Sequence, residues 1–258
     1  MANRSYPTYP DLAGKVAVVS GGSRGIGAAT CRLLAQNGAK VTVNGRDETA
    51  ISSVVEEIQA SGGEAIGVAE DLTDFSAVER TRRRVEEELG PVEVLAAFAG
   101  GQGYPTPTEQ MTEEQWRSVI DSDLTVAFLT VRSFLPGMIE RGRGSIITMA
   151  SSAGRLPSQA SAAYAAAKAG VVMFSRHVAN EVGQHGVRVN CLAPSSVLTE
   201  RVKRLMPEET QREVAAMHQL GRMGTPEDVA LATLFLASES SSWITGVTLD
   251  VAGGRVIV

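Results

Sequence analysis

Short apolar runs alternate with longer amphipathic segments along most of this chain. The short runs are rich in Val, Ile, Leu and Ala, and they predict buried strands at residues 15–20, 40–44, 65–69, 92–98, 145–149, 187–192 and 246–251. Between them, apolar positions recur with a period near 3.6, which predicts helices at residues 26–36, 50–60, 77–89, 116–139, 162–182 and 226–237.

This alternation favours one class of fold. Strands that are apolar on both faces and separated by helices are typical of a parallel sheet covered on two sides. We therefore expect an α/β, Rossmann-type doubly wound sheet of about seven parallel strands with helices on both faces. No linker divides the chain, so residues 1–258 are interpreted as one domain with an N-terminal extension at 1–13. Residues 195–219 break the alternation, and we interpret them as a substrate-covering flap or a solvated surface helix.

Composition narrows the possible roles. Hydrophobic residues make up 43% of the 258 residues, yet no apolar run approaches the roughly 18 residues of a membrane helix. The polar, proline-containing start of the chain does not resemble a secretory signal, so we expect a cytoplasmic protein. A net charge of -5 without a basic stripe argues against nucleic acid as partner. Cys31 and Cys191 lack the spacing of metal ligands, and we expect no metal site.

A glycine-rich turn follows the first predicted strand and opens the first predicted helix. Glycine allows positive φ angles and lets backbone N–H groups approach phosphate oxygens at the amino end of a helix. The context therefore predicts dinucleotide binding rather than a simple tight turn. The expected contacts here are Gly21, Ser23, Arg24, Gly25, Ile26 and Gly27.

The end of the second strand bears on which dinucleotide is bound. An acid there would bind the ribose 2′-hydroxyl, but this chain has Asn44, Gly45 and Arg46. Arg46 and Arg24 are placed to bind a 2′-phosphate, which favours NADP(H), although Arg46 can equally be an exposed loop residue neutralised by neighbouring acids. Asp71 and Leu72 follow the third strand, where Asp71 either accepts from adenine or caps the next helix.

The expected chemistry lies further along the chain. Tyr164 and Lys168 are four residues apart in an alanine-rich helix, so they share one face. A phenol acts as acid or base near neutral pH only if a nearby cation favours the phenolate, and Lys168 is placed to do so. Ser151 ends the fifth strand, where its hydroxyl can donate to a substrate carbonyl. Taken alone, the Tyr–Lys pair also fits a surface lysine beside a packed tyrosine.

Together these residues resemble the short-chain dehydrogenase/reductase family, in the compact form typified by 3-oxoacyl carrier-protein reductases. The landmarks run from the glycine turn through Asp71, Ala99-Gly100, Ser151, Tyr164 and Lys168 to residues 190–199 and 246–254. The resemblance implies that Lys168 also holds the nicotinamide ribose and that Ala99 and Gly100 lie at the cofactor. It further implies that Pro194, Val197 and Thr199 approach the nicotinamide and that the chain forms a homotetramer or a dimer.

The chain departs from the family pattern at four places. Ala97-Phe98 stands for the usual Asn-Asn, Ser195 for Gly and Ser20 for Thr. The largest departure is Asp123, where the family has an Asn that supports a water relay to the lysine. An ionised Asp123 near Lys168 would partly offset the positive field at Tyr164, so we hypothesise a catalytic role and a raised pH optimum. The alternative is a helix-capping or solvent-facing aspartate.

These features predict an NADP(H)-dependent oxidoreductase that moves a hydride between nicotinamide and a small-molecule carbonyl or secondary alcohol. A reductase of ketones or 3-oxoacyl thioesters is the first expectation. The alternatives are a dehydrogenase of polyols, sugars or steroid alcohols, and a weakly catalytic sensor that binds NADP(H).

Overall fold

The computed structural model describes residues 6–101 and 103–257. Within these residues, a seven-stranded sheet has the order β3-β2-β1-β4-β5-β6-β7, and all neighbouring strands are parallel. The strands are β1 (Val16–Ser20), β2 (Lys40–Gly45), β3 (Glu64–Ala69), β4 (Val92–Ala97), β5 (Gly144–Met149), β6 (Val187–Pro194) and β7 (Thr248–Val251).

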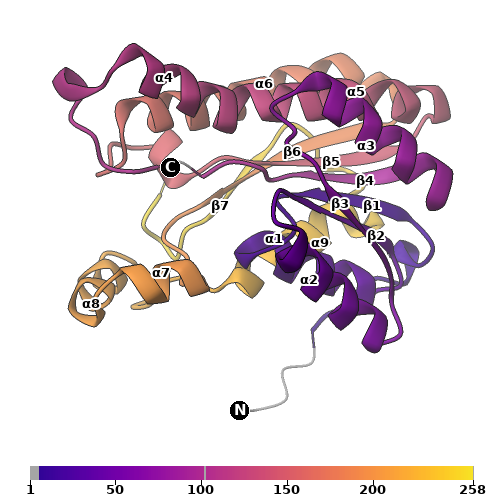
Figure 1. Cartoon of the computed structure of the whole chain (residues 1–258), viewed down its shortest axis with the longest axis horizontal. Coiled ribbons are helices and arrows are strands. Elements are labelled where there is room, and N and C mark those ends of the chain that lie inside the picture. Colours follow the sequence, from indigo (N-terminus) through magenta and orange to yellow (C-terminus); the bar gives the residue numbers. More distant parts are fainter. Residues whose placement is uncertain (1–5, 102, 258) are drawn as a thin grey trace.

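Helices cover both faces of this sheet (Figure 1). One face carries α1 (Gly25–Gln36), α2 (Glu48–Ala60) and α9 (Pro226–Ala237); the other carries α3 (Phe75–Glu88), α4 (Glu113–Ile120), α5 (Val126–Arg141) and α6 (Ala162–Val182). Each layer encloses its own apolar cluster against the sheet, because the strands bury residues on both faces. The predicted doubly wound α/β fold is confirmed.

The strand order reverses direction between β1 and β4. From β1 the chain proceeds outward through β2 and β3, and it then returns to β4 and continues to β7 on the other side. Loops leaving the carboxyl ends of β1 and β4 therefore diverge, and ligands of open α/β sheets bind in the crevice at this point. The predicted cofactor and catalytic residues follow the carboxyl ends of these strands and their neighbours.

The helix expected at residues 116–139 proves longer and irregular. It begins at Glu113 with a capping box between Thr112 and Gln115, and it ends at Arg141 before a left-handed Gly142. Between α4 and α5 the backbone widens into a π-helical turn, η3 (Asp121–Thr125), which contains Asp123. Such turns are rare and are often found at functional sites. The periodicity predicted the helix, but it gave no sign of this turn.

The segment at residues 195–219 contains two helices, α7 (Glu200–Leu205) and α8 (Glu208–Ala216), which lie beyond one end of the sheet (Figure 1). Its base is joined to the chain that follows by a parallel bridge between Val197 and Gly224. Its far end is held by His218, which is 3% exposed and whose Nε2 lies 3.0 Å from Ser195 Oγ. The two ends of the segment are therefore joined to each other, and its base is joined to the chain that follows.

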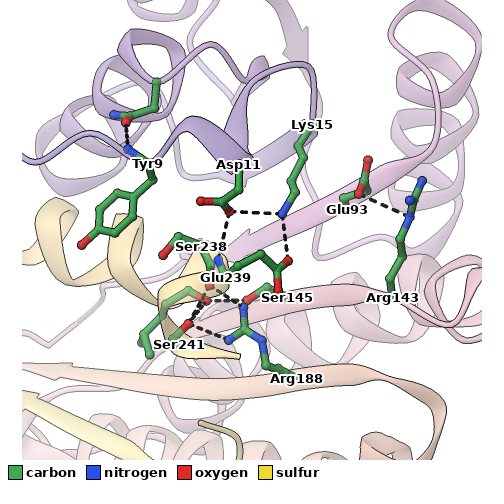
Figure 2. A network of polar contacts seen from close by, with 12 residues as sticks. Tyr9, Asp11, Lys15, Glu93, Arg143, Ser145, Arg188, Ser238, Glu239 and Ser241 are labelled. Atoms are coloured by element: carbon green, nitrogen blue, oxygen red, sulfur yellow. Dashed lines mark hydrogen bonds and ion pairs between the residues drawn. The ribbon is translucent and has the colours of Figure 1, made fainter. Parts of the chain in front are cut away.

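A polar network ties the amino ends of the strands to the chain before β1 (Figure 2). Lys15 Nζ lies 3.4 Å from Asp11 Oδ2 and 3.1 Å from Glu239 Oε1. Arg188 donates to Ser241 Oγ at 2.9 Å and to the carbonyl of Ser238 at 3.1 Å. Burial lowers the pKa of Arg188, which is consistent with a structural tie. The charged groups at the amino ends of the strands thus hold chain segments together. The predicted site lies at the opposite, carboxyl ends of the strands.

No helix in the described residues is both long and apolar enough to cross a membrane. Nor do three or more His, Cys, Asp or Glu side chains among them gather closely enough to hold a metal ion. Residues 1–5 of the predicted N-terminal extension lie outside the described part, whereas Leu12 in its later part is fully buried.

The Arg222–Asp228 pair at the base of residues 195–219 gives stability that depends on pH. Arg222 donates to both Asp228 oxygens, at 2.6 and 2.9 Å, and Asp228 also accepts from Thr225 N to close the capping box of α9. The Arg222 hydrogen bond is the main cause that lowers the pKa of Asp228. A lowered folded-state pKa means that the ionised form stabilises the fold above the unfolded value of about 3.9.

We expect Asp228→Asn to lower the free energy of unfolding by about 1 kcal/mol at pH 7, because it removes a partly screened charge-assisted pair. The difference from wild type should shrink as the pH falls through the lowered pKa of Asp228. Thermal unfolding at several pH values between 3 and 7 measures this. Glu227→Gln, which changes the neighbouring acid, is the control, and a difference that stays constant with pH would contradict the expectation.

Candidate active site

The glycine turn folds as its residue types require. Gly22 N donates to the carbonyl of Asn44 at 2.8 Å, which holds the turn against β2, and Gly25 opens α1 with a φ of +51°. A Cβ at Gly27 would collide with the carbonyl of Gly21, so only glycine allows the helix to start this close to the strand end. The amino end of α1 is therefore left open toward the crevice.

A cavity of about 400 Å³ lies beside this turn. It brings together eight of the predicted cofactor residues: Gly21, Ser23, Arg24, Arg46, Asp71, Leu72, Ala99 and Gly100. The sequence reasoning did not include Ser122 and Val126, which also line it and come from the start of the long helix. A volume of this size with polar walls fits one half of a dinucleotide.

Four charged side chains at the cavity mouth form two ion pairs. Arg24 pairs with Asp47, and Arg46 Nη1 lies 3.7 Å from Asp71 Oδ2. Both arginine side chains are at least 70% exposed, so these contacts are weak and open to exchange with a bound anion. The sequence predicted neutralisation of Arg46 by its neighbours in the chain; its partner is instead Asp71, 25 positions away.

The pKa values of the two aspartates are lowered for different reasons. The pKa of Asp47 is lowered mainly by the hydrogen bond from the Ala50 backbone N–H, and next by the hydrogen bond from Arg24. Partial burial acts to raise the pKa of Asp71, but hydrogen bonds from Thr73 and the charge of Arg46 outweigh it. Asp71 accepts from both Thr73 N and its hydroxyl, whereas Asp74 caps α3. The alternative that Asp71 caps this helix is therefore wrong.

The residues expected near the nicotinamide follow β6. Pro194 ends that strand, and Val197 bridges to Gly224. A Cβ built on Gly25 would lie 3.1 Å from the methyl group of Thr199, so the glycine turn and Thr199 approach each other closely. The fold thus brings the start of residues 195–219 against the helix that opens the cofactor cavity.

The tyrosine and lysine share one face of α6. Ser161 caps this helix by accepting from Tyr164 N at 3.3 Å, which places Tyr164 in the first turn. Lys168 Nζ lies 5.5 Å from the centroid of the Tyr164 ring. The Lys168 side chain is 3% exposed, and its Nζ donates to the carbonyl of Met149 at 3.1 Å. The alternative of a surface lysine is therefore wrong.

Asp123 forms the buried partner of this lysine. Its Oδ1 lies 3.0 Å from Lys168 Nζ, and the aspartate side chain has no exposed surface. Gly101 N donates to Oδ1 at 2.6 Å, and Ser122 Oγ donates to Oδ2 at 2.9 Å. A Cβ at Gly100 would lie 2.6 Å from Oδ1, so glycine makes room for the carboxylate. The alternative of a capping or solvent-facing aspartate is therefore wrong.

Ser151 stands at the carboxyl end of β5, as expected. Its Oγ accepts from Ala153 N at 3.2 Å and so caps the short helix η4 (Ser152–Gly154). A Cβ at Gly154 would lie 2.6 Å from Ala169 N, which means that this turn packs directly on the backbone of α6. Ser151 is therefore held near the helix that carries Tyr164 and Lys168, with part of its surface exposed.

Three contacts at the site escaped sequence reasoning. Ser20 Oγ accepts from Phe98 N at 2.9 Å and from Ala99 N at 3.1 Å, so a hydroxyl supports the backbone at the place where Ala97-Phe98 stands for the family's Asn-Asn. Gly103 lies against Tyr164, since a Cβ there would be 3.2 Å from two ring atoms. The third is the His218–Ser195 contact. Only Ser20 carried a signal, because it is the hydroxyl residue that stands for the family's Thr at the end of the first strand.

The arrangement supports proton transfer to or from an oxygen atom. A hydroxyl, a phenol and a buried ammonium lie at one end of the sheet, beside a cavity suited to a dinucleotide. Donors directed at a carbonyl oxygen stabilise the negative charge that grows there when the carbon accepts a hydride. The Lys168 ammonium, 5.5 Å from the centroid of the Tyr164 ring, places a positive charge beside the phenol.

Known proteins resemble this chain over nearly its whole length. Residues 21–255 match the family model described as enoyl-(acyl carrier protein) reductase. The chain is 35% identical to 2,5-dichloro-2,5-cyclohexadiene-1,4-diol dehydrogenase from Sphingobium indicum over 254 residues, which cover 98% of each chain. It is 37% identical to 3-oxoacyl-(acyl-carrier-protein) reductase from Chlamydia pneumoniae over 243 residues, or 94% of this chain and 97% of the relative.

A solved structure agrees with the fold. The crystal structure of a proposed gluconate dehydrogenase from Agrobacterium tumefaciens aligns with a TM-score of 0.92 at 32% identity. The alignment covers 98% of this chain and 100% of that one.

Proposed function

Because this chain belongs to the short-chain dehydrogenase/reductase family, as the sequence resemblance implied, we propose that it reduces a ketone or a 3-oxoacyl thioester with NADPH. The chain is an oxidoreductase that interconverts CH–OH and C=O groups with a nicotinamide cofactor. The observation that supports the proposed acid–base chemistry is the buried Lys168 ammonium, 5.5 Å from the Tyr164 ring and held by Asp123.

In the proposed mechanism, Ser151 and Tyr164 act on the substrate oxygen, and Lys168 acts through Tyr164. The nicotinamide, when bound, supplies or accepts the hydride. Ser151 donates a hydrogen bond to the carbonyl oxygen, and Tyr164 transfers its phenolic proton to that oxygen as negative charge develops. Lys168 stabilises the phenolate that remains, while the carbonyl of Met149 and the carboxylate of Asp123 hold its ammonium in place.

The preference for NADP(H) is supported by charge. The end of β2 carries no carboxylate that would bind a ribose 2′-hydroxyl, and Arg24 and Arg46 both line the cavity. Arg24 and Arg46 are held by Asp47 and Asp71 in exposed ion pairs. A bound 2′-phosphate can displace these aspartates and form stronger charge-assisted hydrogen bonds with the two arginines. The glycine turn and the cavity together fit a dinucleotide.

A second candidate is oxidation of a ring alcohol. The Sphingobium indicum relative is named as a dehydrogenase of a cyclohexadiene diol, and its similarity extends over 98% of this chain. The same three side chains serve that direction, with the Tyr164 phenolate as the base. Polyol, sugar and steroid alcohols belong to the same chemical class. A weakly catalytic sensor of NADP(H) is the remaining alternative.

Assembly and location are also proposals. Trp116 on α4, Phe128 on α5 and Met173 on α6 are large apolar side chains that are 41%, 44% and 61% exposed. These three helices cover the same face of the sheet, and a second copy would bury their apolar surface. This supports a homotetramer or dimer. The cytoplasmic location stays a prediction from the start of the sequence.

Tyr164→Phe tests the reaction itself. We expect turnover of activated ketones, diketones and 3-oxoacyl thioesters to fall by roughly 10³-fold, because the variant lacks the proton donor. The affinity for NADPH, measured by its fluorescence, should change little. Tyr9→Phe, which removes a phenol from a distant residue, is the control. If the wild-type chain binds NADPH but converts no compound in either direction, the sensor alternative gains support.

Arg46→Gln tests the cofactor preference. We expect the KM for NADPH to rise about 10- to 100-fold, as loss of a charge-assisted contact to a 2′-phosphate would cause, while the KM for NADH changes little. Steady-state reduction of one ketone with each cofactor measures this. Arg32→Gln, which removes an arginine that pairs with Glu57 on α2, is the control. Equal use of NADH and NADPH by the wild type would refute the preference.

Asp123→Asn tests the family departure. The negative charge of Asp123 partly offsets the field of the Lys168 ammonium at the phenol, so its removal should favour the phenolate. We expect the pH optimum of alcohol oxidation to fall. Asp121→Asn changes an exposed acid of the same turn and should leave the optimum unchanged. An unchanged optimum in Asp123→Asn would remove Asp123 from the mechanism.

A further inference from the structure

Tyr104 and Arg201 meet at the mouth of the proposed active site. We propose that Arg201 binds an anionic group of the substrate, most simply a carboxylate, while the reacting carbonyl lies between Ser151 and Tyr164. The substrate would then be an oxo acid or hydroxy acid rather than a neutral ketone. This inference rests on the proposed function and on the interpretation of residues 195–219 as a flap.

The contact lies next to the reacting phenol. Gly103 lies against the Tyr164 ring, since a Cβ there would be 3.2 to 3.3 Å from three ring atoms. Tyr104 follows in the chain, and the guanidinium carbon of Arg201 lies 5.2 Å from the centroid of the Tyr104 ring. The ring under the guanidinium therefore belongs to the residue directly after the glycine that touches the phenol.

The backbone before Arg201 is well anchored. Thr199 caps α7 by accepting from Val202 N at 3.3 Å, and Leu198 N donates to the carbonyl of Gly224 at 2.8 Å. The methyl group of Thr199 lies close to Gly25 in the glycine turn. Arg201, two residues later, thus projects from a segment that is fixed relative to the cofactor cavity.

The charge of Arg201 is not neutralised by the protein. It forms no ion pair within residues 6–101 and 103–257, whereas its neighbour Lys203 pairs with Glu200 at 2.7 Å. Residues 201–207 hold three cations and no acid, and residues 100–108 on the facing loop hold no charged side chain. Residues 195–219 as a whole carry four acids and four bases, so the anionic ligand is attracted by the guanidinium of Arg201 itself and not by a positive segment.

The chemistry of the contact suits a carboxylate. A guanidinium is flat, and its N–H donors lie in its plane, so a ring over one face leaves those donors available. The Tyr104 ring attracts the cation without cancelling its charge. A carboxylate can then accept two parallel hydrogen bonds from Arg201 while the ring holds the side chain in position.

The test compares two ketones that differ in one charge, 4-oxocyclohexanecarboxylate and its methyl ester. We expect Arg201→Gln to lower kcat/KM for the carboxylate by about 10- to 100-fold, and for the ester by less than about threefold, since one charge-assisted contact is lost. Lys203→Gln removes an equal charge from the same helix. It should leave unchanged the ratio of kcat/KM for the carboxylate to kcat/KM for the ester. Tyr104→Leu should lower the ratio about two- to fivefold, and Tyr104→Phe should preserve it.

A phosphate is the other source of such a charge. The 3-oxobutanoyl thioesters of phosphopantetheine and of N-acetylcysteamine form a second pair, with and without phosphate. In one outcome, Arg201→Gln lowers kcat/KM only for the phosphopantetheine thioester and not for the carboxylate ketone. Arg201 would then bind the phosphate of a carrier arm, and the proposal of an oxo acid substrate would be overturned. An unchanged ratio for both pairs, or an equal loss in Lys203→Gln, would overturn the proposed contact.

A binding measurement separates this inference from the proposed reaction. If the wild-type chain reduces neither ketone and none of the diketones and 3-oxoacyl thioesters above, the reductase proposal fails, but the dissociation constant of unreactive cyclohexanecarboxylate still tests Arg201. Calorimetry with NADP⁺ present should give at least about tenfold weaker binding for Arg201→Gln. Equal binding by the wild type and the variant would overturn the inference.

Discussion

The buried ion pair between Lys168 and Asp123 is the contact on which the site depends. Moving an ammonium and a carboxylate out of water costs several kcal/mol for each ion, and the pair offsets this only when its other hydrogen-bonding groups are satisfied. Here the carbonyl of Met149 accepts from the ammonium, while Gly101 N and Ser122 Oγ donate to the carboxylate. The pair therefore joins the end of β5, the loop after β4, the π-helical turn and α6. The position of the ammonium beside the phenol follows from all four.

The strand order explains how the rest of the site is assembled around that pair. Because the chain reverses direction between β1 and β4, the glycine turn and the loop after β4 lie side by side at one edge of the sheet. Ser20, at the end of β1, accepts hydrogen bonds from the backbone after β4 and holds this edge together. Across the crevice, Thr199 approaches Gly25 and brings the segment after β6 to the same place. The glycine turn is thus in contact with the loop after β4 on one side and with the segment after β6 on the other.

Sequence reasoning succeeded where the signal was local. Apolar periodicity predicted the strands and most helices, and the four-residue spacing of Tyr164 and Lys168 placed both on one helical face. Sequence reasoning was less successful at predicting which charged loop residues pair with each other. The partner of a loop side chain depends on how the neighbouring helices are oriented. Arg24, not Arg46, pairs with the neighbouring Asp47, and Arg46 instead pairs with Asp71.

The sequence by itself determined the alternation of strands and helices, the glycines that only a close turn tolerates, and the residue types available for acid–base chemistry. These follow from local sterics and from burial, which act within a few residues. Only the tertiary structure decided that a π-helical turn carries Asp123 to Lys168 and that Arg201 lies over Tyr104. Those contacts join residues 45 and 97 positions apart, and their geometry is set by the packing of whole helices and loops against one sheet, which no local pattern encodes.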